Sequence, residues 1–207
     1  AEEIIMEISE IIKNGGLMIY PLTALFIWGL VIIVIKSMAL RRNRVINNKI
    51  IEQIETILLD NKIPEATAYC KQNPIPMTNI ILAGILNYQK SESELKEILE
   101  EAGRQEIPII RKYLSTLGTI ASAAPLMGLL GTVLGMISVF ATLSQQQTVN
   151  ANMLAGGISE ALITTAFGMI IALPTLAFYN HFITHVQNLI IEMEKISLHL
   201  VVVLKRL

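Results

Sequence analysis

The sequence predicts an all-α membrane protein with three transmembrane helices, the second and third of which extend into a cytoplasmic helical bundle. Three observations support this fold class. Of the 207 residues, 53% are hydrophobic and only 16% are charged, whereas ordinary soluble domains carry about 25% charged residues. The chain also contains two long uncharged stretches, and its apolar residues recur at helical spacing rather than in the alternation typical of strands.

The first transmembrane helix is expected at residues 17–40. Between Asn14 and Ile35 no side chain is charged, and the apolar part is long enough to cross a hydrocarbon core of about 30 Å at 1.5 Å per residue. The preceding residues, 1–16, are acidic and amphipathic, which favours a helix on the outer side of the membrane.

The second uncharged stretch predicts two further spans. From Tyr113 to Ile191, Glu160 is the only Asp, Glu, Lys or Arg. A polar, uncharged segment at 144–153 divides this stretch and is expected to form an outer-side turn. Transmembrane helix 2 is therefore predicted at 113–143 and transmembrane helix 3 at 154–182, followed by a cytoplasmic C-terminal helix at 183–207.

Basic residues cluster on one side of each predicted span, and the turn at 144–153 has none. Cytoplasmic loops of membrane proteins carry an excess of Lys and Arg. The pattern therefore predicts an outer (periplasmic) N-terminus and a cytoplasmic C-terminus. The residues are Lys36, Arg41, Arg42, Arg44 and Lys49 after the first span, Arg104, Arg111 and Lys112 before the second, and Lys195, Lys205 and Arg206 after the third.

The region 41–112 is expected to be helical and cytoplasmic. Its last helix begins with serine caps and acidic residues. We expect that helix to continue through a kink at Pro108 into the second span, giving roughly 50 residues, about 75 Å at 1.5 Å per residue. An apolar stripe near the start of the region indicates a local core; a groove for a foreign helix is the alternative. The stripe comprises Ile46, Ile50, Ile54, Ile57 and Leu58.

Glu160 is the leading candidate for a functional residue. An ionised carboxylate at the bilayer centre costs at least about 2.5–3.5 kcal/mol, so the group needs a wet cavity or a polar partner. Thr164 lies one helical turn later and Gly156 and Gly157 one turn earlier, with Thr165 slightly round the helix. The alternative is a Glu that only forms hydrogen bonds near the outer headgroups.

The second span carries small residues on one side. Gly128, Gly131, Thr132 and Gly135 lie on or near one face, and Gly131 and Gly135 match the spacing of closely packed membrane helices. Pro125 frees a backbone carbonyl within the same helix. We expect the glycines to serve packing and Thr132 to line a polar path.

Other chemistry is not expected. His181 and His185 have the i, i+4 spacing of metal ligands, but no third ligand accompanies them, so no metal site is predicted. Cys70 and His199 are interpreted as structural. The sequence has no nucleophile elbow, phosphate loop, CxxC or carboxylate pair, so neither an enzyme nor a cofactor is predicted. With a net charge of −1, nucleic acid is not an expected partner.

The segments "AAPLMGLLGTVLGMISVF" and "GGISEALITTAFGMIIALPTLAFYN" resemble the two signature segments of the MotA/TolQ/ExbB proton channel family. The three-span layout is similar to ExbB and TolQ rather than to four-span MotA. By this resemblance, Glu160 matches the family's span-three glutamate, Thr165 the threonine five residues later, and Thr132 the span-two threonine. Thr164 is extra, and the resemblance leaves open which of the adjacent threonines faces the pore.

The resemblance also implies a function and partners. We expect a homo-oligomer, a pentamer in ExbB, around a dimer of a single-span ExbD-like protein in the bacterial inner membrane. The complex would use the proton motive force to energise TonB-dependent transport across the outer membrane. A TolQ-like subunit of the Tol system and a passive membrane scaffold for single-span partners are the alternatives. A solute carrier is disfavoured by the short chain and the lack of inverted repeats.

Overall fold

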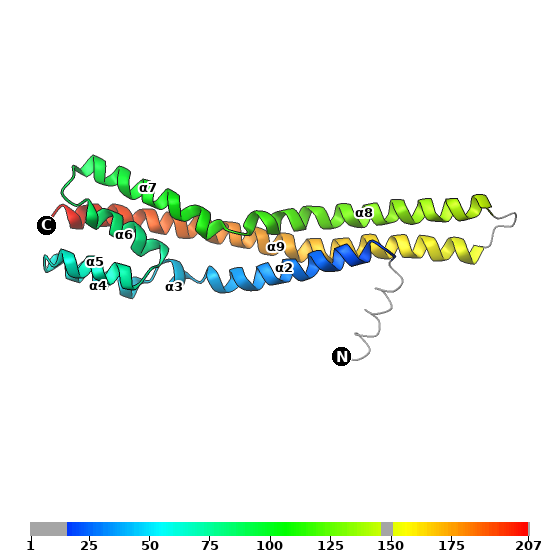
Figure 1. Cartoon of the computed structure of the whole chain (residues 1–207), viewed down its shortest axis with the longest axis horizontal. Coiled ribbons are helices and arrows are strands. Elements are labelled where there is room, and N and C mark those ends of the chain that lie inside the picture. The colour runs from blue at the N-terminus through cyan, green and yellow to red at the C-terminus, as the bar shows by residue number, and fades with distance from the viewer. Residues whose placement is uncertain (1–15, 146–150, 207) are drawn as a thin grey trace, which may run out of the picture. The chain divides into compact units, whose positions relative to one another are not determined.

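The structure is a computed structural model that describes residues 16–145 and 151–206. The predicted N-terminal helix and the centre of the predicted turn lie outside the described residues. All regular structure in the described part of the chain is helical. Three helices are long and apolar enough to cross a membrane (Figure 1): α2 (Ile19–Ala39), α8 (Leu114–Gln145) and α9 (Ala151–Leu204). This confirms the predicted all-α class with three helices of membrane-spanning length, the last of which extends well beyond a single span.

The chain divides into two compact units. The first comprises the described residues up to Val34 together with Tyr113–Asn180. It contains most of α2, all of α8 and the first part of α9. Leu22 of α2 is fully buried against α8 and α9, where it meets Ala124, Ile171 and Ala172, with Met127 and Phe167 packed around them.

The second unit comprises Ile35–Lys112 and His181–Leu207. Its short helices pack in succession, α4 on α5, α5 on α6 and α6 on α7. The complete burial of Ile46, Ile54 and Leu58 confirms the local core predicted from the apolar stripe. Besides the last parts of α2 and α9, the helices are α3 (Arg42–Val45), α4 (Asn48–Leu59), α5 (Ile63–Gln72), α6 (Pro76–Leu86) and α7 (Glu92–Arg111).

The start of α7 follows the predicted serine cap. Ser91 Oγ accepts from the Glu94 backbone N–H at 3.3 Å, and the Glu94 carboxylate accepts from the Ser91 backbone N–H at 3.0 Å. This reciprocal pair satisfies two donors that the first helical turn leaves free. The bonds from Ser91 also lower the pKa of the Glu94 carboxyl.

The expectation of one continuous helix from α7 into α8 is wrong. The chain passes unbroken through Pro108, which lies inside α7, and the interruption comes at Lys112 and Tyr113 instead. Tyr113 has a φ of 66°, a left-handed backbone that cannot continue a right-handed helix. Lys36 Nζ donates to the Ile110 carbonyl at 2.9 Å, which in a continuous helix would accept the N–H of Leu114. A cation from α2 thus satisfies the end of α7.

Candidate functional site

Small residues line the contact between α8 and the first part of α9. At nearly every turn, a residue of α8 meets a residue of α9 with one of the two lacking a large side chain, so the two backbones approach closely. This is the packing typical of membrane helices. The pairs are Ala124 with Gly168, Gly128 with Thr165, Gly131 with Thr164, Gly135 with Ala161, and Val139 with Gly157. We call this contact the small-residue seam.

Gly168 makes the closest approach to backbone atoms in the seam. A Cβ placed on Gly168 would lie 2.6 Å from the carbonyl oxygen of Ala124 and 3.1 Å from the Cα of Gly128. Sequence reasoning missed Gly168. Its position four residues after Thr164 continues the small-residue spacing of α9, which is the signal that was available.

Two of the predicted packing residues differ from the others. Among the described residues, no atom lies within 4 Å of where a Cβ on Gly156 would be, whereas the adjacent Gly157 faces Val139. Pro125 lies inside α8, which continues through it; without an N–H it leaves one carbonyl of the preceding turn without its usual donor. The packing role of Gly156 therefore gains no support within this chain and stays a prediction.

The three candidate threonines have different surroundings. Thr164 is only 2% exposed, and its Oγ1 donates to the Glu160 carbonyl at 2.9 Å. Thr165 is half-buried and donates across the seam to the Gly128 carbonyl at 2.9 Å. Thr132 is also half-buried and donates to a carbonyl of its own helix at 2.6 Å. The chain itself encloses Thr164. Thr165 and Thr132 are therefore better placed to meet a group outside the chain.

The Glu160 side chain is exposed on α9. Its carboxylate lies against Gly16, just before α2 begins: a Cβ on Gly16 would collide with Glu160 Oε1 and lie 3.0 Å from Cδ. Thr164 lies one helical turn after Glu160 in α9, and its side chain contacts Gly131 of α8. The structure thus gathers the lone acid, a threonine, the α8 glycines and the start of α2 within the first unit.

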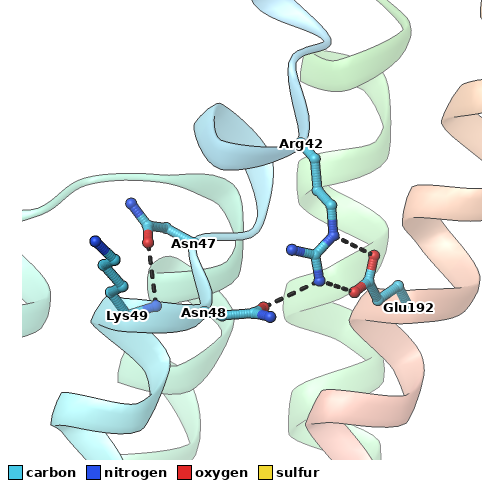
Figure 2. A network of polar contacts seen from close by, with 5 residues as sticks. All are labelled: Arg42, Asn47, Asn48, Lys49 and Glu192. Atoms are coloured by element: carbon cyan, nitrogen blue, oxygen red, sulfur yellow. Dashed lines mark hydrogen bonds and ion pairs between the residues drawn. The ribbon is translucent and has the colours of Figure 1, made fainter.

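A separate polar cluster lies in the second unit (Figure 2). The Arg42 guanidinium binds both carboxylate oxygens of Glu192, and it also donates to Asn48 Oδ1 at 3.0 Å. Asn47 caps α4 by accepting from the Lys49 backbone N–H at 3.2 Å. The sequence identified Arg42 only as part of a basic flank, because a partner 150 residues away has no local signature.

The two candidate histidines also lie in the second unit. Their rings stack with centroids 6.3 Å apart, and His185 Nε2 lies 2.8 Å from the Leu40 carbonyl oxygen, at the end of α2. Among the described residues, no group of three or more His, Cys, Asp or Glu side chains is placed to hold a metal ion. The observed contact of His185 is that of a structural side chain.

The fold and the candidate site define a helical membrane protein with one carboxylate in a long uncharged region beside a tightly packed seam. A family model described as the MotA/TolQ/ExbB proton channel family matches residues 72–195, more than half of the chain. The chain belongs to this family, which is one of channel proteins rather than of enzymes.

Some relatives carry ExbB names and another carries a TolQ name. The putative biopolymer transport protein ExbB-like 3 of Synechocystis is 33% identical over 176 residues, which cover 81% of each chain. The biopolymer transport protein ExbB of Salmonella typhimurium is 33% identical over 114 residues, covering 48% of this chain and 47% of its own length. The Tol-Pal system protein TolQ of Haemophilus influenzae is 40% identical over 79 residues, 38% of this chain and 35% of that protein.

Proposed function

We propose that this chain is the ring-forming subunit of a proton-driven motor of the ExbB type in the bacterial inner membrane. Several copies, five as in ExbB, surround a dimer of a single-span ExbD-like protein. The proton motive force moves that partner relative to the ring and so energises TonB-dependent transport across the outer membrane. Glu160, Thr132 and Thr165 line the proton path.

One observation carries this proposal: Glu160 is exposed on α9 within a stretch that holds no other charged residue. A carboxylate facing lipid there costs at least about 2.5–3.5 kcal/mol. Water or a polar group from another chain removes this cost, since either can bind the carboxylate. A water-filled lumen shared by several copies supplies both.

The chain alone does not contain a complete relay of titratable groups. Apart from Glu160, α8 and α9 carry no Asp, Glu, Lys or Arg between Leu114 and Ile191. A second group on a partner helix inside the ring completes the path. Each proton that crosses releases about 2.3 kcal/mol per 100 mV of membrane potential, which is the energy available to move the partner.

The predicted orientation of the chain sets the direction of proton flow and stays part of the proposal. The basic residues that flank the three spans favour a periplasmic N-terminus and a cytoplasmic second unit. Protons then enter near the turn at 144–153, close in sequence to Glu160, and leave toward the second unit.

The test is proton flux in vesicles that contain the chain together with its single-span partner. We expect Glu160→Gln to reduce the flux to that of empty vesicles and Thr132→Val to reduce it partially. Glu194→Gln is the matched control, because Glu194 is an exposed acid of the same helix but belongs to the second unit. Unchanged flux in Glu160→Gln would remove Glu160 from the path.

A TolQ-like subunit is the second candidate, favoured by the 40% identity of the Haemophilus TolQ over 79 residues. Both candidates use the same proton path, so the partner distinguishes them. Co-purification with an ExbD-like protein and restored TonB-dependent uptake support the first candidate, whereas restored Tol function supports the second. A passive scaffold predicts that Glu160→Gln keeps both activities.

A further inference from the structure

We propose that Gly16 is a positioning residue for Glu160: its missing side chain leaves the space that the Glu160 carboxylate occupies. A Cβ on Gly16 would fall well inside van der Waals contact with Glu160 Oε1, and it would lie 3.0 Å from Cδ and 3.5 Å from Cγ. This inference rests on the proposed function, because it assigns a role to the chain segment that holds the proton-carrying group in place.

The segment around Gly16 is fixed on the first unit. Gly16 has a φ of 62°, a left-handed backbone that favours glycine, and its carbonyl accepts the N–H of Ile19 at 3.3 Å. Ile19 is completely buried. The Cβ of Met18 lies 3.4 Å from where a Cβ on Gly131 would be, so this turn is packed against the small-residue seam.

The backbone of Glu160 is fixed as well. Thr164 donates to the Glu160 carbonyl, and the Thr164 side chain is held in the seam, 2.9 Å from where a Cβ on Gly131 would be. With both backbones fixed, the direction of the Glu160 side chain is what remains to be set. The space beside Gly16 selects the rotamer that brings the carboxylate to the start of α2.

The same geometry predicts which property a larger residue changes. The colliding atoms belong to the end of a flexible side chain, so a Cβ at position 16 moves the carboxylate and leaves the helices in place. The start of a helix carries partial positive charge and favours a nearby anion. α2 up to Ile35, and α8 throughout, contain no Asp, Glu, Lys or Arg that could take the place of this charge. A larger residue at position 16 therefore moves the carboxylate away from the start of α2 and changes its accessibility to a reagent.

Three variants separate the collision from the backbone preference of Gly16. Gly16→Ala introduces both a Cβ and a residue that resists the left-handed conformation. Gly16→Asn introduces the same Cβ on a residue that tolerates that conformation. Gly156→Ala is the matched control, because no described residue lies within 4 Å of its new Cβ. Circular dichroism and the oligomer size in detergent show first whether each variant folds.

The readout is the rate at which dicyclohexylcarbodiimide modifies Glu160 in vesicles at one fixed pH. Mass spectrometry of the peptide gives this rate. We expect the rate to change in both Gly16 variants, because the carboxylate has moved, and to stay unchanged in Gly156→Ala. An unchanged rate in Gly16→Asn would overturn the proposal.

Proton flux provides the second readout. The double variant Gly16→Ala with Glu160→Asp shortens the acid by one methylene, which removes the oxygen position that overlaps the new Cβ. We expect its flux to equal that of Glu160→Asp alone; independent, multiplied losses would contradict the contact. If the parent complex conducts no protons, the proposed function fails, while the labelling rates still decide whether Gly16 positions Glu160.

Discussion

Replacing Gly168 with alanine should force α8 and α9 apart. The added Cβ would lie 2.6 Å from the Ala124 carbonyl oxygen, 3.1 Å from the Gly128 Cα and 3.3 Å from the Gly128 nitrogen. All three are backbone atoms inside α8, so no side-chain rotation relieves the overlap. One of the two helices has to shift as a whole.

The magnitude follows from two opposing effects. Overpacking a tightly packed contact costs about 1–3 kcal/mol. Alanine is also the better helix former, which offsets up to about 1 kcal/mol. Gly156→Ala gains the same helix preference, and no atom in the described part of the chain lies within 4 Å of the new Cβ. The difference between the two variants therefore isolates the overlap at about 1–3 kcal/mol.

Thermal unfolding of the full chain in detergent, followed by circular dichroism, measures this difference. For a chain of this size, 1 kcal/mol corresponds to about 2–4 °C, so Gly168→Ala should unfold about 2–12 °C below Gly156→Ala. Equal unfolding temperatures, or a higher temperature for Gly168→Ala, would show that the seam is looser than the structure has it.

Three further predictions concern single contacts. Thr165→Val removes the hydrogen bond to the Gly128 carbonyl and should lower the free energy of unfolding by about 0.6 kcal/mol, at most about 1.7 kcal/mol. Thr165→Ser keeps the hydroxyl and is the control, so equal losses in both variants would contradict the bond. Lys36→Met removes the side chain that donates to the Ile110 carbonyl and should lower the free energy of unfolding by about 1–3 kcal/mol. Hydrogen exchange at the end of α7 should become faster, and unchanged exchange there would exclude the contact. Burial raises the pKa of the Cys70 thiol to about 11, so a maleimide should modify the folded chain slowly at neutral pH and faster as the pH rises toward that value. The denatured chain should react rapidly; rapid modification of the folded chain at neutral pH would show that the thiol is accessible.

The sequence by itself determined which segments are long and apolar enough to span a membrane, and that Glu160 is the single acid among them. These properties are sums over neighbouring residues, so they do not depend on how the helices pack. The cap at Ser91 was readable for the same reason, because both of its bonds join residues three positions apart. The two signature segments that identified the family are local as well.

Only the tertiary structure decided which side each helix presents to its neighbour. Successive residues of a helix are turned by about 100°, since 3.6 residues make one turn. Gly157 therefore meets Val139, while Gly156 faces none of the residues that the structure describes. Likewise Thr164 is enclosed, while the adjacent Thr165 reaches across to α8. A pattern of small residues does not fix that rotation to within one residue.

Contacts between distant segments were likewise beyond the sequence. Just before the break at Tyr113, the Ile110 carbonyl is bound by Lys36, which lies 74 residues earlier in the chain. The Glu160 carboxylate lies beside Gly16, which is likewise remote from it in the sequence. Neither pairing leaves a periodic or compositional trace, because it depends on where folding brings two separate helices together.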